Sequence, residues 1–392
     1  MGYRLGSRLG GSRAGALAAL GLLLSGGWAL AVAQGYTEAL TAGLLFLAID
    51  REIEGHSTQA LALGTLVALA RPEAFVLLCL FAAIGWRRNR VQLRVALPLL
   101  AAVPLLWIVP DWIGSGQLLH ASAVSRKVVP TGAAAAGTAL REAALSPPIP
   151  LTVCGLAFIA FDRGGRSGSY GRIALLVLAW FLLLVILMFG FGYPASGRFF
   201  DPATALACVL GAVGAVRLAG KVAPYKNAIV AGLLVAVAGL TVGFRVDPTV
   251  EQARATLVRG RLVHQLHGVI DRTGPTALQR CKRVLVPGGM GWLRGAVAWD
   301  LHMHIRQVLG VWTAAPDYIE QLGAHELGAT PPPPAGPVRV GRLKRNAALL
   351  LPFHGTRVVG TAGVTPHLRA VAVDGRWTAY ALGGSSCLSG AA

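Results

Sequence analysis

The sequence predicts an α-helical polytopic membrane domain of about nine spans over residues 1–244, followed by a small extracytoplasmic α/β domain over residues 245–392. Composition is the first indication of this fold class. Of the 392 residues, 54% are hydrophobic and only 14% are charged, whereas a soluble domain carries about 25% charged residues. The mean hydropathy is +0.59. The second indication is that the apolar runs stop at residue 244, where the pattern becomes that of a water-soluble domain.

Nine apolar segments account for the expected spans. Several are shorter than the ~20 residues that a perpendicular span needs, so flanking residues complete them or the bilayer thins locally. The segments are Ala14–Gln34, Tyr36–Ile49, Thr58–Ala70, Ala74–Trp86, Val95–Pro110, Ile149–Phe161, Ile173–Gly192, Phe200–Leu218 and Asn227–Phe244.

The distribution of basic residues orients these spans. Lys and Arg concentrate in cytoplasmic loops, and Arg4, Arg8 and Arg13 precede the first span, which places the N-terminus in the cytoplasm. The other inner loops are Asp50–Ser57, Arg87–Arg94, Asp162–Arg172 and Ala219–Lys226, the last three of them basic. The outer segments are Asp111–Pro148, Tyr193–Phe199 and everything from Arg245 on. We therefore expect a multi-pass protein of the cell membrane.

The net charge of +19 would suggest a nucleic-acid partner in a soluble protein. Here it partly reflects arginine-rich loops that orient membrane helices, so we expect no nucleic-acid partner. We expect the basic turn Arg87–Arg94 to meet anionic membrane lipid heads at the inner face.

The long outer loop Asp111–Pro148 begins irregularly, with Gly and Ser, and its stretch Gly132–Leu145 is alanine-rich enough for a short surface helix. In the tail, helices are expected at Pro248–Arg272 and Trp292–Leu309, on either side of a buried strand at Arg283–Val286. After a proline-rich linker, further strands are expected at Val338–Leu343, Ala348–Pro352, Arg357–Val359, Arg369–Val373 and Trp377–Leu382.

The five cysteines divide between the two domains. Three lie in apolar runs and pack as small hydrophobic side chains. Cys281 and Cys387 lie in the tail, where an oxidising compartment would let them pair.

By this topology, polar residues from span ends and outer loops gather on the outer face. As ordinary interfacial groups they would need no further role, and Arg71 with Glu73 would be an intramolecular pair. As a group they favour a binding site, because charges at membrane depth face a cavity or a partner. The candidate substrate-binding residues are Glu38, Arg71, Glu73, Asp111, Trp112, His120 and Arg198, and Asp201 lies on the same face.

This set of residue types suits one chemistry. Arginine binds phosphate in a planar fork, and Arg198 stands in a short outer turn just before a span. Transfer to an acceptor hydroxyl needs a carboxylate to take its proton, and by location Glu38 or Asp111 would serve.

At these residues the chain resembles the polytopic GT-C glycosyltransferases of bacteria, and an actinobacterial branch of that superfamily in particular. The resemblance covers roughly Gly35 to Leu218 and rests on the order of several short motifs. These are Glu38-Ala39-Leu40, Leu69-Ala70-Arg71-Pro72-Glu73-Ala74, Pro110-Asp111-Trp112-Ile113-Gly114-Ser115-Gly116, His120-Ala121-Ser122, and Gly197-Arg198-Phe199 with Pro202.

The resemblance implies an enzyme that moves a sugar from a polyprenyl-phosphate carrier to an extracytoplasmic glycan or protein acceptor, with no cofactor. The family's usual catalytic carboxylate follows its first span, but no Asp or Glu precedes Glu38 here. The catalytic residue is therefore unknown, and Glu38 is expected to shape the cavity. Span parity suggests that Ala14–Gln34 corresponds to the family's third span. The absence of the family's first span, the following loop and its second span would then reflect a shortened gene model, a true truncation or a degenerate copy.

Two other functions stay open at this point. A non-catalytic membrane scaffold or export component is favoured by the missing acid, and a transporter is disfavoured because no internal repeat is visible. His264-x-x-His267 and Asp300-x-His302-x-His304 have metal-ligating residue types. A zinc site needs three or four convergent ligands, so we expect solvated histidines and no metal.

Overall fold

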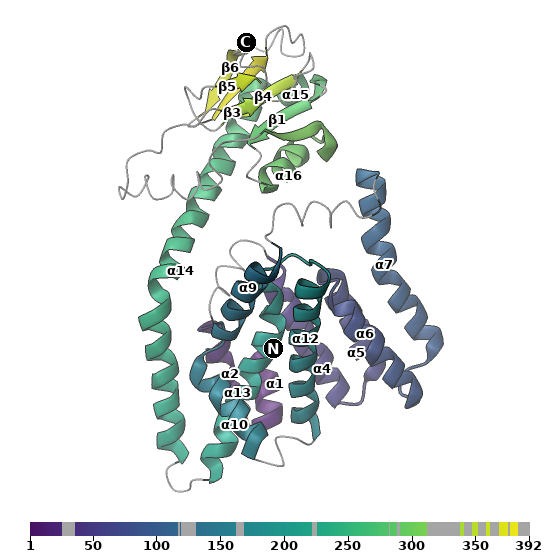
Figure 1. Ribbon diagram of the computed structural model, residues 1–392, viewed down its shortest axis with the longest axis vertical. Coiled ribbons are helices and arrows are strands. Elements are labelled where there is room, and N and C mark those ends of the chain that lie inside the picture. The colour runs from purple at the N-terminus through teal and green to yellow at the C-terminus, as the bar shows by residue number, and fades with distance from the viewer. Residues whose placement is uncertain are drawn as a thin grey trace. The chain divides into compact units, whose positions relative to one another are not determined.

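The computed structural model describes residues 1–25, 36–116, 118, 131–161, 168–221, 226–281, 283–287, 291–311, 338–340, 347–351, 358–360, 368–374 and 377–382. The chain forms two compact units, Met1–Val250 and Glu251–Ala392. Figure 1 shows the first as a bundle of helices and the second as a small sheet with helices. Each unit is described by itself below.

Most helices of the first unit follow the apolar segments of the sequence to within a few residues. The first expected span, Ala14–Gln34, is different, because its helix ends at Leu23, and residues 26–35 lie outside the described part of the chain. A short helix at Gly2–Gly10 was not predicted, because it is too short and too polar to resemble a span. The bounds are α1 Gly2–Gly10, α2 Ser12–Leu23, α4 Glu38–Ile53, α5 Ser57–Ala70, α6 Ala74–Arg87, α7 Leu93–Ser115, α9 Ala133–Leu145, α10 Ile149–Phe161, α12 Gly168–Gly190, the 3-10 turn η1 Gly197–Phe200, α13 Asp201–Lys221 and α14 Lys226–Thr273.

Fewer of these helices are long enough for a membrane span than the nine expected. In the described part of the chain, three helical segments have the length and hydropathy to cross a bilayer: Leu93–Gly114, Gly168–Gly190 and Gly197–Lys221. The pair α9 and α10 makes a fourth at most, and its two helices are bent by 86°. The expected surface helix after residue 132 is thus confirmed as α9.

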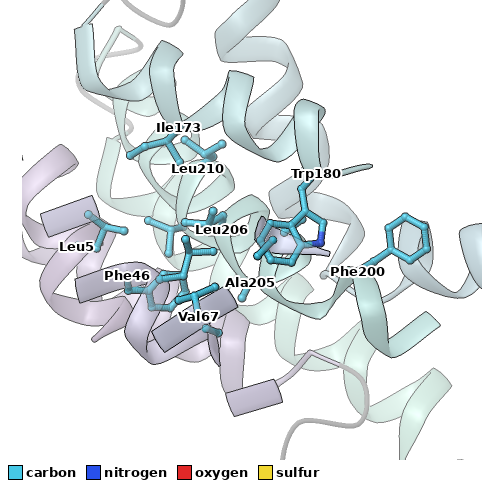
Figure 2. Packing of buried hydrophobic residues seen from close by; sticks show 14 of the residues in the cluster. Leu5, Phe46, Val67, Ile173, Trp180, Phe200, Ala205, Leu206 and Leu210 are labelled. Carbon is cyan, nitrogen blue, oxygen red and sulfur yellow. The ribbon is translucent and has the colours of Figure 1, made fainter. Parts of the chain in front are cut away.

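Helix α13 forms the centre of the bundle, because 78% of its 18-residue apolar stretch is buried. It packs against α2, α4, α10 and α12, and Figure 2 shows Ala205, Leu206 and Leu210 of this helix among the core side chains. Its crossing with α10 is close because glycines face each other there. A Cβ on Gly155 would lie 3.3 Å from the Gly211 backbone. Small residues let membrane helices approach in this way.

This close crossing gives a first testable prediction. A Cβ on Gly211 would lie 2.4 Å from the Leu151 carbonyl oxygen, so Gly211→Ala forces α10 and α13 apart. We expect the free energy of unfolding to fall by about 1–3 kcal/mol, measured as a lower midpoint of thermal unfolding in a fixed detergent. Gly220→Ala on the same helix is the control, because no atom lies within 4 Å of its Cβ position. Equal midpoints for the two variants would contradict the prediction.

Helix α7 lies at the edge of the bundle (Figure 1), and only 11% of its 18-residue apolar stretch is buried. It contacts α5 and α6, and the Trp107 indole nitrogen donates a 2.9 Å hydrogen bond to the Leu69 carbonyl. Prolines at 98, 104 and 110 lie inside this helix, and Gly116 ends it in a left-handed conformation. The helix thus continues five residues beyond the expected end of the span at Pro110.

The boundary between membrane segment and tail differs from the expectation. The sequence predicts a span ending at Phe244 and a separate amphipathic helix at Pro248–Arg272. The structure instead contains one continuous helix, α14, across both. Proline lacks the backbone N–H that an interior helical position donates, yet Pro248 lies within α14 and does not end it.

The second unit is built around a five-stranded mixed sheet of strand order β2-β1-β4-β7-β6. Strand β1 is parallel to both β2 and β4, whereas β7 is antiparallel to β4 and β6. A separate pair joins β3 and β5. The bounds are α15 Pro275–Arg280, β1 Arg283–Pro287, α16 Gly291–Asp300, the 3-10 turn η2 Ile305–Gln307, β2 Val308–Val311, β3 Val338–Val340, β4 Ala347–Leu351, β5 Val358–Gly360, β6 Leu368–Asp374 and β7 Trp377–Leu382.

Two features of the tail were not anticipated. The helix expected over Trp292–Leu309 ends at Asp300, and its last residues form η2 and β2. The four-residue strand β2 is too short for a period-two pattern to reveal it. The core of this unit forms where α16 and the C-terminal end of α14 pack against the sheet. Leu266, Val284, Leu293 and Ala379 are fully buried there.

Candidate functional site

Three of the predicted site residues meet at one end of the helical bundle. Glu38 opens α4, and Arg71 and Glu73 form the turn between α5 and α6. The Arg71 guanidinium donates to the Glu38 carboxylate through Nη2 and lies 3.8 Å from Glu73 through Nη1. All three are buried, with exposed fractions of 2% for Glu38, 6% for Arg71 and 5% for Glu73. With Tyr193, they form the Arg71 cluster.

Tyr193 joins the cluster through a hydrogen bond to Glu73. Its hydroxyl donates to Glu73 Oε2 at 3.2 Å. Burial raises the pKa of the Glu73 carboxyl, and the Arg71 charge opposes that rise. Burial also raises the pKa of the Tyr193 hydroxyl, which keeps it protonated as a donor. One carboxylate oxygen of Glu38 and one of Glu73 are buried without a hydrogen-bond partner in the described part of the chain.

The turn that carries Arg198 is anchored on several sides. Phe200 is completely buried and its ring lies 4.9 Å from that of Phe181. The Trp180 indole nitrogen donates a 3.1 Å hydrogen bond to the Phe199 carbonyl, and Figure 2 shows Trp180 and Phe200 on this side of the core. A Cβ on Gly197 would lie 2.6 Å from Glu142 Oε2 of α9. The turn therefore holds Arg198 in a defined position.

The Arg198 side chain is exposed and lies against two aromatic rings. Its guanidinium carbon is 5.1 Å from the ring centre of Tyr36 and 5.5 Å from that of Phe199. The Arg71 guanidinium carbon lies 5.1 Å from the same Phe199 ring centre. Among the described residues, no carboxylate forms an ion pair with Arg198. Aromatic contacts orient an arginine without neutralising it, so this cation remains available to an anion.

Asp201 lies next to this arginine, in the first turn of α13. Its side chain is partly exposed, and within the described ranges its carboxylate has no ion pair or hydrogen bond. The site thus combines a buried, ion-paired arginine with an exposed arginine and a partly exposed carboxylate.

The structure does not bring every predicted residue into this site. Asp111 and Trp112 lie in the last turns of α7, and no hydrogen bond or ion pair of the described residues joins them to the Arg71 cluster. Trp112 is 54% exposed. His120 lies outside the described residues.

The opposite end of α4 carries a second charged set, the Asp50 network, formed by Arg4, Arg8, Asp50, Arg51 and Glu54. The sequence predicts a turn from Asp50, but α4 continues to Ile53. Asp50 is buried and lies 2.8 Å from both Arg4 and Arg8, so α1 is tied to α4. The Arg8 hydrogen bond lowers the pKa of Glu54.

This network explains why one expected inner loop is acidic and not basic. The segment Asp50–Ser57 is the only expected inner loop that is not basic. Its acids are neutralised by arginines from α1 and from the α6–α7 turn, where Arg90 lies 3.1 Å from Glu52. Groups from expected inner segments therefore contact one another, and groups from expected outer segments meet at the Arg71 cluster.

In the tail, the structure brings together part of the histidine-rich pattern. His267 Nδ1 of α14 lies 2.8 Å from Asp300 Oδ2 at the end of α16. Burial raises the pKa of the Asp300 carboxyl. Within the described ranges, however, no group of three or more His, Cys, Asp or Glu side chains is arranged to hold a metal ion.

Sequence reasoning missed Tyr36 and Tyr193 and gave Asp201 no role. Both tyrosines flank predicted spans, where aromatic residues are common anchors, so their pattern alone did not distinguish them. The signal that could have found Tyr193 is its position five residues before Arg198 in the same short turn.

Comparison of the chain with protein-family models, curated proteins and solved structures gives no match. The functional argument therefore rests on the geometry of this site.

Proposed function

We propose that this protein is a membrane glycosyltransferase of GT-C type, which moves a sugar from a polyprenyl-phosphate donor to an extracytoplasmic glycan or protein acceptor. The observation that carries the proposal is the state of Arg198: exposed, held against Tyr36 and Phe199, and without a carboxylate partner in the described part of the chain. A cation presented in this way at the end of a membrane bundle suits a lipid phosphate.

The other predicted phosphate ligand has a different part in this proposal. Arg71 already forms an ion pair with Glu38, lies 3.8 Å from Glu73, and is nearly inaccessible. Binding a phosphate there would require breaking a buried ion pair, which is costly. We therefore assign donor binding to Arg198. The Arg71 cluster has a structural role in this proposal, as the buried packing beside the donor site.

The cysteines support an extracytoplasmic tail. Cys281 is disulfide-bonded, whereas Cys79, Cys154 and Cys208 form no disulfide. Disulfides persist in oxidising compartments and are rare in the cytosol. Cys387, the partner considered from the sequence, lies outside the described residues.

Donor binding gives the test. In lipid nanodiscs, Arg198→Gln should weaken binding of a polyprenyl-phosphate probe by roughly 10- to 100-fold, because a hydrogen bond to a charged group contributes about 1.5–3 kcal/mol. The dissociation constant is measured directly, and sugar transfer is then followed with radiolabelled polyprenyl-phosphate sugars.

Arg90→Gln is the matched control, because it removes an exposed arginine from the other end of the bundle. Unchanged probe binding in Arg198→Gln would remove the assigned role of Arg198. Failure of the wild-type protein to bind any probe or transfer any sugar would overturn the proposed function.

A non-catalytic scaffold is the second candidate, and one observation favours it. The acids in the Arg71 cluster are engaged in internal contacts that hold helices together, as expected of a purely structural cluster. Probe binding without sugar transfer would favour this alternative.

A further inference from the structure

We propose that Asp201 is the catalytic base of this site, the carboxylate that takes the proton from the acceptor hydroxyl. The inference rests on the proposed function. It starts from a simple requirement: a general base needs a carboxylate that is free to accept a proton and close to the donor phosphate.

The contacts of the other acids exclude them from this task. Glu38 accepts from Arg71, and its remaining oxygen is buried. Glu73 accepts from Tyr193 and is 5% exposed. An acceptor hydroxyl could reach either one only by displacing the buried arginine or the tyrosine. Both acids therefore have a structural role in the site and are not available as the base.

Asp201 differs from them in access and in partners. Its side chain is partly exposed, and no described residue forms an ion pair or hydrogen bond with its carboxylate. It also lies one residue beyond the turn that carries Arg198. An arginine and a carboxylate three residues apart at the start of a helix can pair with each other. Here Arg198 lies over aromatic rings instead, which leaves both groups accessible to substrate.

The backbone holds the two groups in register. Asp201 begins α13, the most deeply packed helix of the bundle, and the Thr204 hydroxyl donates to its carbonyl at 3.0 Å. Phe200, between the turn and the helix, is fully buried. Arg198 and Asp201 are therefore carried by one rigid segment, which suits two groups that act on the same bond.

The proposed step balances as follows. The Asp201 carboxylate accepts the proton of the acceptor hydroxyl and becomes a carboxylic acid. The acceptor oxygen forms a bond to the anomeric carbon of the donor sugar. The bond from that carbon to the phosphate oxygen breaks, and its electron pair leaves with the polyprenyl phosphate, whose added negative charge Arg198 stabilises.

The experiment separates binding from chemistry. The full chain in nanodiscs is assayed for probe binding and for kcat and KM of transfer, as wild type, Asp201→Asn and Asp201→Glu. We expect Asp201→Asn to lower kcat by roughly 100- to 10,000-fold, with the probe dissociation constant changed less than threefold. Asp201→Glu should recover part of kcat, because it restores a carboxylate, and should keep the acidic limb of the pH–rate profile.

Glu52→Gln, at the Arg90 end of the bundle, is the matched control and should leave kcat unchanged. If Asp201→Asn binds the probe and transfers sugar at the wild-type rate, the inference is overturned while the proposed function stands. If Asp201→Asn no longer binds the probe but Asp201→Glu does, Asp201 shapes the donor site and is not the base. If wild type fails to transfer, both are overturned.

Discussion

Replacing Arg71 with methionine should lower the free energy of unfolding by about 3–5 kcal/mol, the largest effect expected of any single charge change in this protein. The Arg71 guanidinium is the only ion-pair partner of Glu38 within the described ranges. Its loss leaves a carboxylate buried at 2% exposure without a counter-charge. The measurement is the midpoint of thermal unfolding of the purified chain in a fixed detergent.

Two further variants identify the cause. Replacing both partners, in Glu38→Met with Arg71→Met, should recover part of the stability, because the buried Glu38 charge is then removed, while Glu73 keeps its hydrogen bond from Tyr193. Arg90→Met breaks the exposed pair with Glu52 and should cost at most about 1 kcal/mol. If the double variant is no more stable than Arg71→Met alone, burial of the unpaired Glu38 is not the reason for the loss.

Phe200→Ala should destabilise the first unit by about 3–5 kcal/mol and should also weaken binding of the polyprenyl-phosphate probe. The Phe200 ring is fully buried against Phe181 and fixes the turn from Arg198 to Asp201. The cavity left by the ring removes packing energy, and the loosened turn no longer holds the arginine in place. Both the unfolding midpoint and the probe dissociation constant are measured.

Phe161→Ala is the control for this pair of effects, because Phe161 is 85% exposed at the end of α10. It should change neither quantity appreciably. Strong probe binding by Phe200→Ala, at a temperature where the variant is folded, would show that the turn keeps its shape without this anchor.

Much of the secondary structure could be predicted, because apolar run lengths and turn residues are local properties of the chain. The strand at Trp377–Leu382 matches β7, and the segment at Ile149–Phe161 matches α10. Two expectations were wrong. Pro248 does not interrupt α14, although proline is a local helix-breaking signal. The helix expected to reach Leu309 gives way to β2, where pairing with β1 outweighs the local pattern.

The candidate site was predicted in part. Alternation of spans was enough to expect Glu38, Arg71 and Glu73 at one end, because each stands at the end of an apolar run. Asp111 and Trp112 were grouped with them on the same ground, but they are carried by α7 at the edge of the bundle. Alternation fixes which end of a helix a residue occupies, and it does not fix which neighbours that helix packs against.

The sequence by itself determined that this chain is rich in apolar helices, that a second unit with strands follows them, and that acids and arginines collect at the ends of the helices. Only the tertiary structure decided that Arg71 is buried against Glu38 and that Arg198 lies over Tyr36 and Phe199. The physical reason is distance in the chain. These contacts join residues at the start of α4, in the turn between α5 and α6, and in the turn before α13. Their formation depends on how the helices rotate and pack against one another.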